Sequence, residues 1–154
     1  MATPEPMGHG VIEAVREIEA PRRLVYDAWT TLEHRRQWFV GPGWTEIERH
    51  LDLRVGGVEV ARGRFESGTE TCYTARFHLI DAGVRQVYAF DMHVDERHFS
   101  VSLAGVEFTD IPGGTRLIYT EQAFFLDGDY GTENRDGGTH GLLEQFTRHV
   151  STLA

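Results

Sequence analysis

The hydrophobic and polar positions change their period along the chain. Between residues 44 and 126 the period is two, as where Tyr73, Ala75 and Phe77 alternate with polar residues. Short Gly-rich, Pro-Gly or acidic pairs interrupt this alternation at 56–57, 67–68, 82–83, 95–96 and 112–114. Such pairs are typical of hairpin turns between antiparallel strands. The pattern predicts a meander of about six strands with one buried face.

Other patterns flank the meander. Residues 11–18 alternate as a first strand, and Pro21 suits the first turn of a helix because it lacks an N–H donor. A break near Thr30 predicts a second short helix, which the Gly-Pro-Gly run at 41–43 ends. The inward face of the two helices is expected to carry Leu24, Val25, Ala28, Trp29, Leu32, Arg36 and Phe39.

The last segment has helical spacing. Its apolar positions are Leu142, Leu143, Phe146, Val150 and Leu153, which predict a helix over 139–154. Residues 125–138 are polar and predict a loop, with Asp136 or Thr139 as the cap of the helix. The element order is therefore strand, two helices, meander, helix, which is an α+β class. We expect a flexible tail over 1–10 and a single domain over 11–154.

Composition narrows the range of partners. The 154 residues carry a formal net charge of −9, which repels nucleic acid and anionic lipid. No apolar run approaches the ~18 residues that a membrane span needs, so no membrane insertion is expected. The first ten residues also lack the apolar stretch of a signal peptide. Cys72 is the single cysteine and cannot form an intrachain disulfide, which favours a cytoplasmic protein.

The order of several short motifs resembles a known fold family. These are Trp38-Phe39 with Gly41-Pro42, the runs 53–57, 106–108, 114–122 and 125–128, and Gly138-Thr139 before Leu142-Leu143. Together they resemble the START-like, or Bet v 1-like (SRPBCC), helix-grip domains, in the branch named after the activator of Hsp90 ATPase homologue 1 (AHSA1). The resemblance implies a curved antiparallel sheet of six to seven strands around a long C-terminal helix, with a cavity between them.

The resemblance implies three kinds of activity. Members of this superfamily bind apolar ligands, act as cyclases or aromatases, or stimulate a chaperone ATPase. In the eponymous activator, a separate N-terminal domain with an Asn- and Trp-rich motif carries most of the activating contacts. This chain has one asparagine, Asn134, and no room for such a domain. We therefore expect no ATPase stimulation.

Motifs for metal, cofactor or nucleophile chemistry are missing from the sequence. The eight histidines show no ligand spacing, although two on facing strands could meet, and the glycine pairs lack a phosphate-binding fingerprint. No Gly-x-Ser-x-Gly motif is present, and Cys72 has no neighbour in sequence that would lower its pKa. We expect neither a metal nor a cofactor.

Glu121 is the candidate polar residue of the cavity. It shares a strand face with Leu117, Tyr119 and Phe125, so it points inward if they do. A carboxylate in an apolar cavity needs a partner, and Arg62 or Arg64 is the expected one. Such a set orients a polar ligand group, serves as general acid or base with Tyr119, or forms an inert structural ion pair. A bulge near Gly63 or Gly105 would turn some of these residues outward.

The function expected from these observations is binding of a small apolar or amphipathic ligand. The candidate ligand-binding residues are Trp38, Phe39, Phe77, Tyr88, Phe90, Met92, Ser102, Tyr119, Glu121 and Phe146. Ser100 shares the inward face of Ser102 and adds a hydroxyl. One alternative is a cyclase-like enzyme that uses the same cavity. Another is a protein-interaction module, a chaperone partner or a homodimer, that uses the outward face of Phe99, Val101, Leu103, Ile118 and Phe124.

Overall fold

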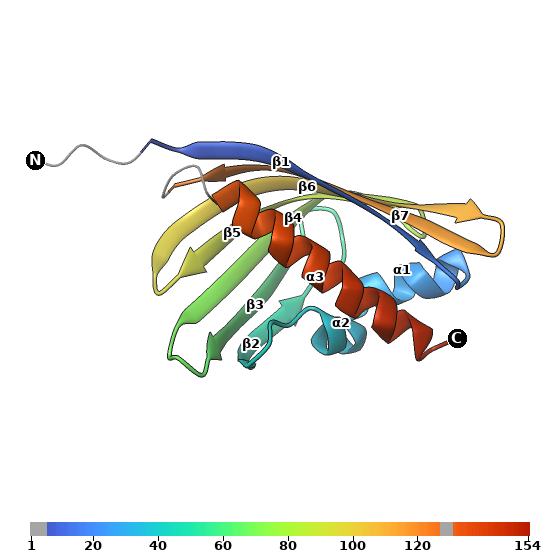
Figure 1. Ribbon diagram of the computed structural model, residues 1–154, viewed down its shortest axis with the longest axis horizontal. Coiled ribbons are helices and arrows are strands. Elements are labelled where there is room, and N and C mark those ends of the chain that lie inside the picture. Colours follow the sequence, from blue (N-terminus) through green and yellow to red (C-terminus); the bar gives the residue numbers. More distant parts are fainter. Residues whose placement is uncertain (1–5, 127–130) are drawn as a thin grey trace, which may run out of the picture.

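The computed structural model describes residues 6–126 and 131–154 as a curved sheet with a long helix across its concave face (Figure 1). The strands are β1 (Gly8–Ile18), β2 (Trp44–Leu51), β3 (Val58–Phe65), β4 (Glu70–Asp81), β5 (Arg85–Val94), β6 (Arg97–Ile111) and β7 (Gly114–Phe125). The helices are α1 (Arg22–Thr30), α2 (Leu32–Trp38) and α3 (Gly131–Ser151). The helices α1 and α2 lie near the C-terminal end of α3.

The seven strands form one antiparallel sheet in the order β1-β7-β6-β5-β4-β3-β2. Strands β2 to β7 are neighbours in the order of the chain, so they form the predicted meander of six strands, and β1 pairs with β7. The α+β helix-grip fold predicted from the sequence is confirmed. No helix among the described residues is long and apolar enough to cross a membrane.

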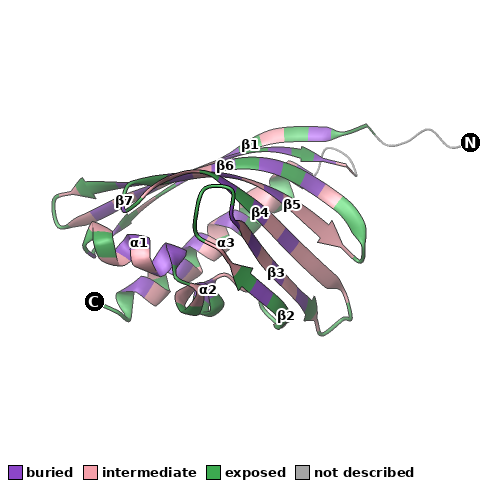
Figure 2. Cartoon of the chain, turned by 180° about the vertical axis from the view of Figure 1, so that it is seen from behind, coloured by how far each residue is buried: buried purple, intermediate pink, exposed green. Residues whose placement is uncertain are grey.

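Burial alternates along the strands, as the period of two requires (Figure 2). In β6, Ser100, Ser102 and Ala104 are buried, whereas Val101 and Leu103 between them are exposed. The inward residues of β1, β4, β5, β6 and β7 form one core with α1, α2 and α3. The inward direction predicted for Glu121 is confirmed, since only 1% of this residue is exposed.

All five predicted turns lie between consecutive strands. The β5–β6 turn places two non-glycine residues at positive φ, Asp95 at 47° and Glu96 at 66°, a backbone conformation in which Asp is enriched among non-glycine residues. The sheet bulges between Glu46 and Glu48 of β2, opposite the β3 position where we expected an irregularity. At Gly105 the register continues without a shift, so no bulge turns the neighbouring residues of β6 outward there.

Three predicted boundaries or faces are wrong. Helix α3 begins at Gly131, so the predicted loop is too long, and Asp136 and Thr139 lie inside the helix and do not cap it. Strand β1 begins at Gly8, within the predicted tail. In α2 the buried charged residue is Arg35, and Arg36 is exposed. Each error concerns polar or glycine residues whose position depends on contacts far along the chain.

Candidate functional site

A cavity of about 570 Å³ lies between the concave face of the sheet and the helices α2 and α3. Its lining is mainly apolar and rich in aromatic side chains, and it includes Trp29, Trp38, Phe39, Trp44, Phe65, Tyr73, Tyr88, Phe90, Met92 and Phe99. Helix α3 contributes Gly131, Gly138 and Gly141, which occupy little space. Pockets of a few hundred Å³ with an apolar lining and few polar groups are typical small-molecule sites.

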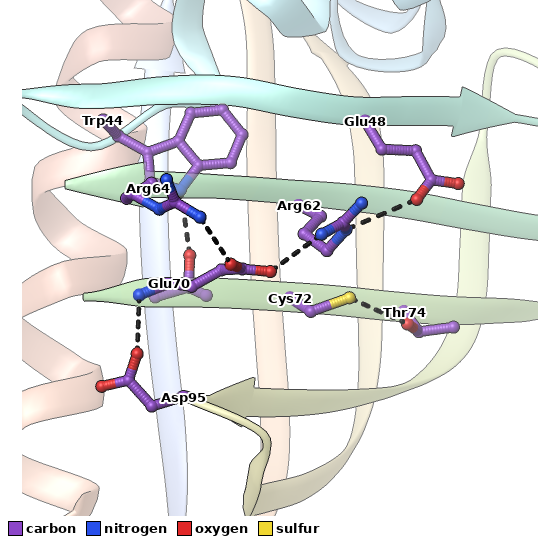
Figure 3. Close-up of polar contacts among 9 residues, drawn as sticks. Trp44, Glu48, Arg62, Arg64, Glu70, Cys72, Thr74 and Asp95 are labelled. Carbon is purple, nitrogen blue, oxygen red and sulfur yellow. Dashed lines mark hydrogen bonds and ion pairs between the residues drawn. The ribbon is translucent and has the colours of Figure 1, made fainter. Parts of the chain in front are cut away.

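Small residues on the inward face of β3 leave space for the Trp44 ring and for the cavity. The ring of Trp44 lies over Gly63, where an added Cβ would sit 2.1 Å from Cε2 of the indole. The indole N–H donates to Oγ1 of Thr71 over 2.9 Å, which fixes the ring across β3 (Figure 3). Ala61 follows the same inward face and also lines the cavity. Gly63 therefore leaves room for the Trp44 ring, and Ala61 adds little side-chain volume to the cavity.

Glu121 accepts hydrogen bonds on both carboxylate oxygens. Oε1 accepts the Tyr119 hydroxyl at 2.7 Å, and Oε2 accepts the Ser102 hydroxyl at 2.7 Å. Nη1 of Arg135 donates to Oε2 over 2.6 Å. The carboxylate is thus paired with a cation and accepts from two hydroxyl groups, which is the arrangement expected of a stable buried ion pair.

Arg135 comes from the first turns of α3 and ties that helix to the sheet. Its Nη2 donates to the Ser100 hydroxyl over 2.6 Å. The guanidinium lies 5.5 Å from the ring centre of Phe90 and 5.1 Å from that of Phe125, within the range of cation–π attraction. Only 15% of its side chain is exposed. The residue is positioned because Glu121, Ser100 and two rings hold it.

The predicted partners of Glu121, Arg62 and Arg64, are wrong. Both lie on the opposite face of β3 and bind Glu70 at 2.9 and 3.3 Å, while Arg62 also approaches Glu48 at 3.5 Å (Figure 3). Hydrogen bonds from the two arginines lower the pKa of Glu70. The physical reason is strand parity, because Ala61 and Gly63 take the inward positions.

A second buried ion pair, which sequence reasoning missed, joins Arg35 of α2 to Glu59 of β3. Arg35 is 4% exposed and Glu59 is 2% exposed. Nε of Arg35 donates to Oε2 of Glu59, and Nη1 donates to the Trp29 carbonyl over 2.8 Å. Burial by itself would lower the pKa of Arg35, but Glu59, together with Tyr73 and Tyr88, offsets this effect and the pKa is raised. One signal was available, since Arg35 precedes the buried Trp38 by three residues.

Three buried tyrosines add hydroxyl groups to the site. Burial raises the pKa of Tyr73, Tyr88 and Tyr119 above the usual value, and nearby carboxylates raise it further. All three therefore stay neutral at physiological pH and keep an O–H donor. The Tyr119 hydroxyl donates to Glu121. The Tyr73 hydroxyl makes no hydrogen bond to any described residue.

Seven of the ten predicted ligand-binding residues line the cavity, and three do not. Those that line the cavity are Trp38, Phe39, Tyr88, Phe90, Met92, Tyr119 and Glu121. Ser102 lies behind Glu121, to which it donates. Phe146 packs between Trp29 and Trp38, with ring centres 5.2 and 4.8 Å away. Phe77 lines a separate small hollow beyond Arg35. Phe99, which we assigned to the outward face, lines the cavity and contacts Phe125.

Histidines meet in pairs across the fold. His93 and His98 stack across the β5–β6 hairpin with ring centres 4.5 Å apart. Nδ1 of His34 in α2 and Nε2 of His149 in α3 are 2.8 Å apart. Within residues 6–126 and 131–154, no three or more His, Cys, Asp or Glu side chains gather in a way that could hold a metal ion.

Comparison with known proteins identifies similar chains. The family described as "Activator of Hsp90 ATPase homolog 1-like protein" matches residues 19–151. A solved structure of an uncharacterized protein from Rhizobium leguminosarum is 32% identical, with a TM-score of 0.91 over 97% of this chain and 99% of that one. Protein Mll3558 from Rhizobium loti is 34% identical, with a TM-score of 0.85 over 94% and 99%.

A more distant structure shares only the fold. DynU16, a protein in the dynemicin biosynthetic locus, is 16% identical, with a TM-score of 0.68 over 92% of this chain and 47% of that one. No curated protein matches this chain.

Proposed function

The chain belongs to the family of Activator of Hsp90 ATPase homolog 1-like proteins, and on that premise we propose that it binds a small, largely apolar ligand with one polar end. The observation that carries the proposal is the cavity of about 570 Å³ beneath α3, whose lining is mainly apolar and rich in aromatic side chains. Burying apolar ligand surface there is favourable by roughly 25 cal/mol per Å².

The ionisable groups of the cavity support binding in preference to catalysis. A general base must be free to take a proton from the substrate. Both oxygens of Glu121 already accept hydrogen bonds, one of them from Arg135, with which Glu121 forms an ion pair. These contacts favour a structural role for Glu121, namely holding the first turns of α3 on the sheet. A cyclase-like enzymatic function is therefore our second candidate.

A screen with a cavity-filling variant tests this proposal. The panel contains fatty alcohols, fatty acids, naphthalenes and polycyclic phenols, and binding is followed by native mass spectrometry and thermal shift. Ala61→Leu adds volume inside the cavity, whereas Ala89→Leu makes the same change on a partly exposed, outward position of β5. We expect A61L to weaken binding at least tenfold and A89L to leave it unchanged. No binding by any compound, or equal binding by A61L, would contradict the proposal.

A further inference from the structure

Two donors in the cavity have no acceptor among the described residues. Arg35 uses Nε for Glu59 and Nη1 for the Trp29 carbonyl, which leaves Nη2 without a hydrogen bond to residues 6–126 or 131–154. The Tyr73 hydroxyl likewise has no such partner. Both residues line the cavity and are more than nine-tenths buried. Neither atom is among the described side-chain atoms that are fully buried without a partner, so both are reached from the cavity, where a bound group can accept from them.

The two donors lie at the same end of the cavity. Both contact Phe39. Cζ of Arg35 is 4.4 Å from the centre of the Phe39 ring, and the ring centres of Tyr73 and Phe39 are 5.0 Å apart. Tyr73 also contacts the ring of Phe90 at 5.0 Å. The guanidinium and the phenol are therefore held by one set of rings, with little freedom to turn away from the cavity.

The charges around the cavity already balance. Arg35 is paired with Glu59 and Arg135 with Glu121, so the buried cations each have a carboxylate. An anionic ligand would lose its hydration on entering the cavity and would find no unpaired cation there to compensate for that loss. A neutral oxygen needs only donors. Tyr73 keeps its proton because burial raises its pKa, and it donates at any physiological pH.

We propose that the polar end of the ligand is a neutral hydrogen-bond acceptor, a ketone, ester or amide carbonyl, which accepts from Tyr73 and Arg35 while its apolar part lies against the aromatic lining. This assignment rests on the proposed binding function and deepens it. The Glu121 cluster is the other polar end of the cavity. Its carboxylate and the Nη1 and Nη2 groups of Arg135 are already engaged with each other and with Ser100, Ser102 and Tyr119.

Three naphthalenes of similar size test the assignment. The probes are 2-acetylnaphthalene, 2-ethylnaphthalene and 2-naphthoate, and their dissociation constants are measured by calorimetry or fluorescence at pH 8. Tyr73→Phe removes only the hydroxyl. Tyr26→Phe is the matched control, because Tyr26 is also buried but packs on Phe108 away from the cavity lining.

We expect Y73F to weaken the ketone about three- to tenfold, as the loss of one hydrogen bond does. It should leave 2-ethylnaphthalene within about twofold, and Y26F should change neither. Replacing Arg35 and Glu59 together by Met keeps the charge balance and should also weaken the ketone selectively. In the wild type, 2-naphthoate should bind more weakly than the ketone.

The outcomes separate this inference from the proposed function. If the probes bind and compete with one another, but Y73F affects ketone and hydrocarbon equally, the carbonyl subsite is wrong and the binding function stands. Tighter binding of 2-naphthoate than of the ketone would also overturn the neutral-acceptor assignment. If none of the three probes binds while another compound of the panel does, the carbonyl subsite is wrong and the binding function stands; if no compound binds at all, both fail.

Discussion

Replacing Glu121 by leucine is expected to lower the free energy of unfolding by about 3–5 kcal/mol, because it breaks a buried ion pair by removing one partner. The Tyr119 and Ser102 hydroxyls lose their acceptor, and Arg135 loses its counter-ion. The net value of a neutral hydrogen bond is about 1 kcal/mol, and that of a bond to a charged group about 1.5–3 kcal/mol. Leucine has a similar volume, so no large void is left.

The exposure of Arg135 sets where the loss falls in that range. Its side chain is 15% exposed and keeps its hydrogen bond to Ser100, so the orphaned guanidinium is partly solvated. We therefore expect the lower half of the range, about 3–4 kcal/mol. A loss of that size is a large share of the roughly 5–15 kcal/mol that stabilises a small domain.

Urea denaturation of three variants measures the effect. These are Glu121→Leu, Arg135→Leu and the double variant, which removes both charges. Since the double variant leaves no unpaired charge, it should lose at least about 1 kcal/mol less than the two single losses added together. A change within about ±0.5 kcal/mol for E121L, as surface substitutions give, would refute the buried pair. An additive double variant would show that the two side chains do not interact.

Two further changes probe α3. Gly137→Ala should raise the free energy of unfolding by about 0.5–1 kcal/mol in urea denaturation, because a Cβ there meets nothing within 4 Å and alanine favours the helix. Gly131→Ala should instead destabilise, since its Cβ would lie 2.4 Å from the Phe125 ring; equal gains at both positions would contradict this packing. Burial and the neighbouring His34 lower the pKa of His149 below its usual 6.5, so the folded state binds fewer protons and is favoured above pH 6.5. Urea denaturation at several pH values should show that the difference in free energy of unfolding between wild type and His149→Gln shrinks as the pH falls below about 6.5. A difference that stays constant with pH would contradict the lowered pKa of His149.

The meander and the two short helices were predictable because their signals are local. Alternation over strands such as 70–81 and glycine-containing turns specify antiparallel pairing within a few residues of sequence. The inward direction of Glu121 followed from the same parity, since it lies two residues from Tyr119 and four from Leu117 and Phe125. These inferences needed no knowledge of what lies across the cavity.

The start of α3 was not predictable from helical propensity. Gly131, Gly137, Gly138 and Gly141 each lower the propensity by roughly 1 kcal/mol relative to alanine. Contacts across the fold compensate for this loss, above all the ion pair and hydrogen bonds of Arg135 with β6 and β7. When a residue is positioned by contacts with distant strands, the sequence around it contains no pattern that reveals its role. Arg135 was therefore missed.

The β3 error has a related origin and shows what a cavity demands of a strand. Taking Arg62 or Arg64 as the partner of Glu121 placed them, and the apolar Val58 and Val60 on the same face, inward. The buried residues are instead Glu59, Ala61 and Gly63. A strand that fills a core places large apolar residues inward, whereas one that leaves room for a ring and a guanidinium places small or paired polar residues there. Gly63 accommodates Trp44, and Glu59 pairs with Arg35. In this sequence, the strand that borders the cavity therefore has polar and glycine residues on its inward face, and hydrophobic alternation alone assigns its two faces the wrong way round.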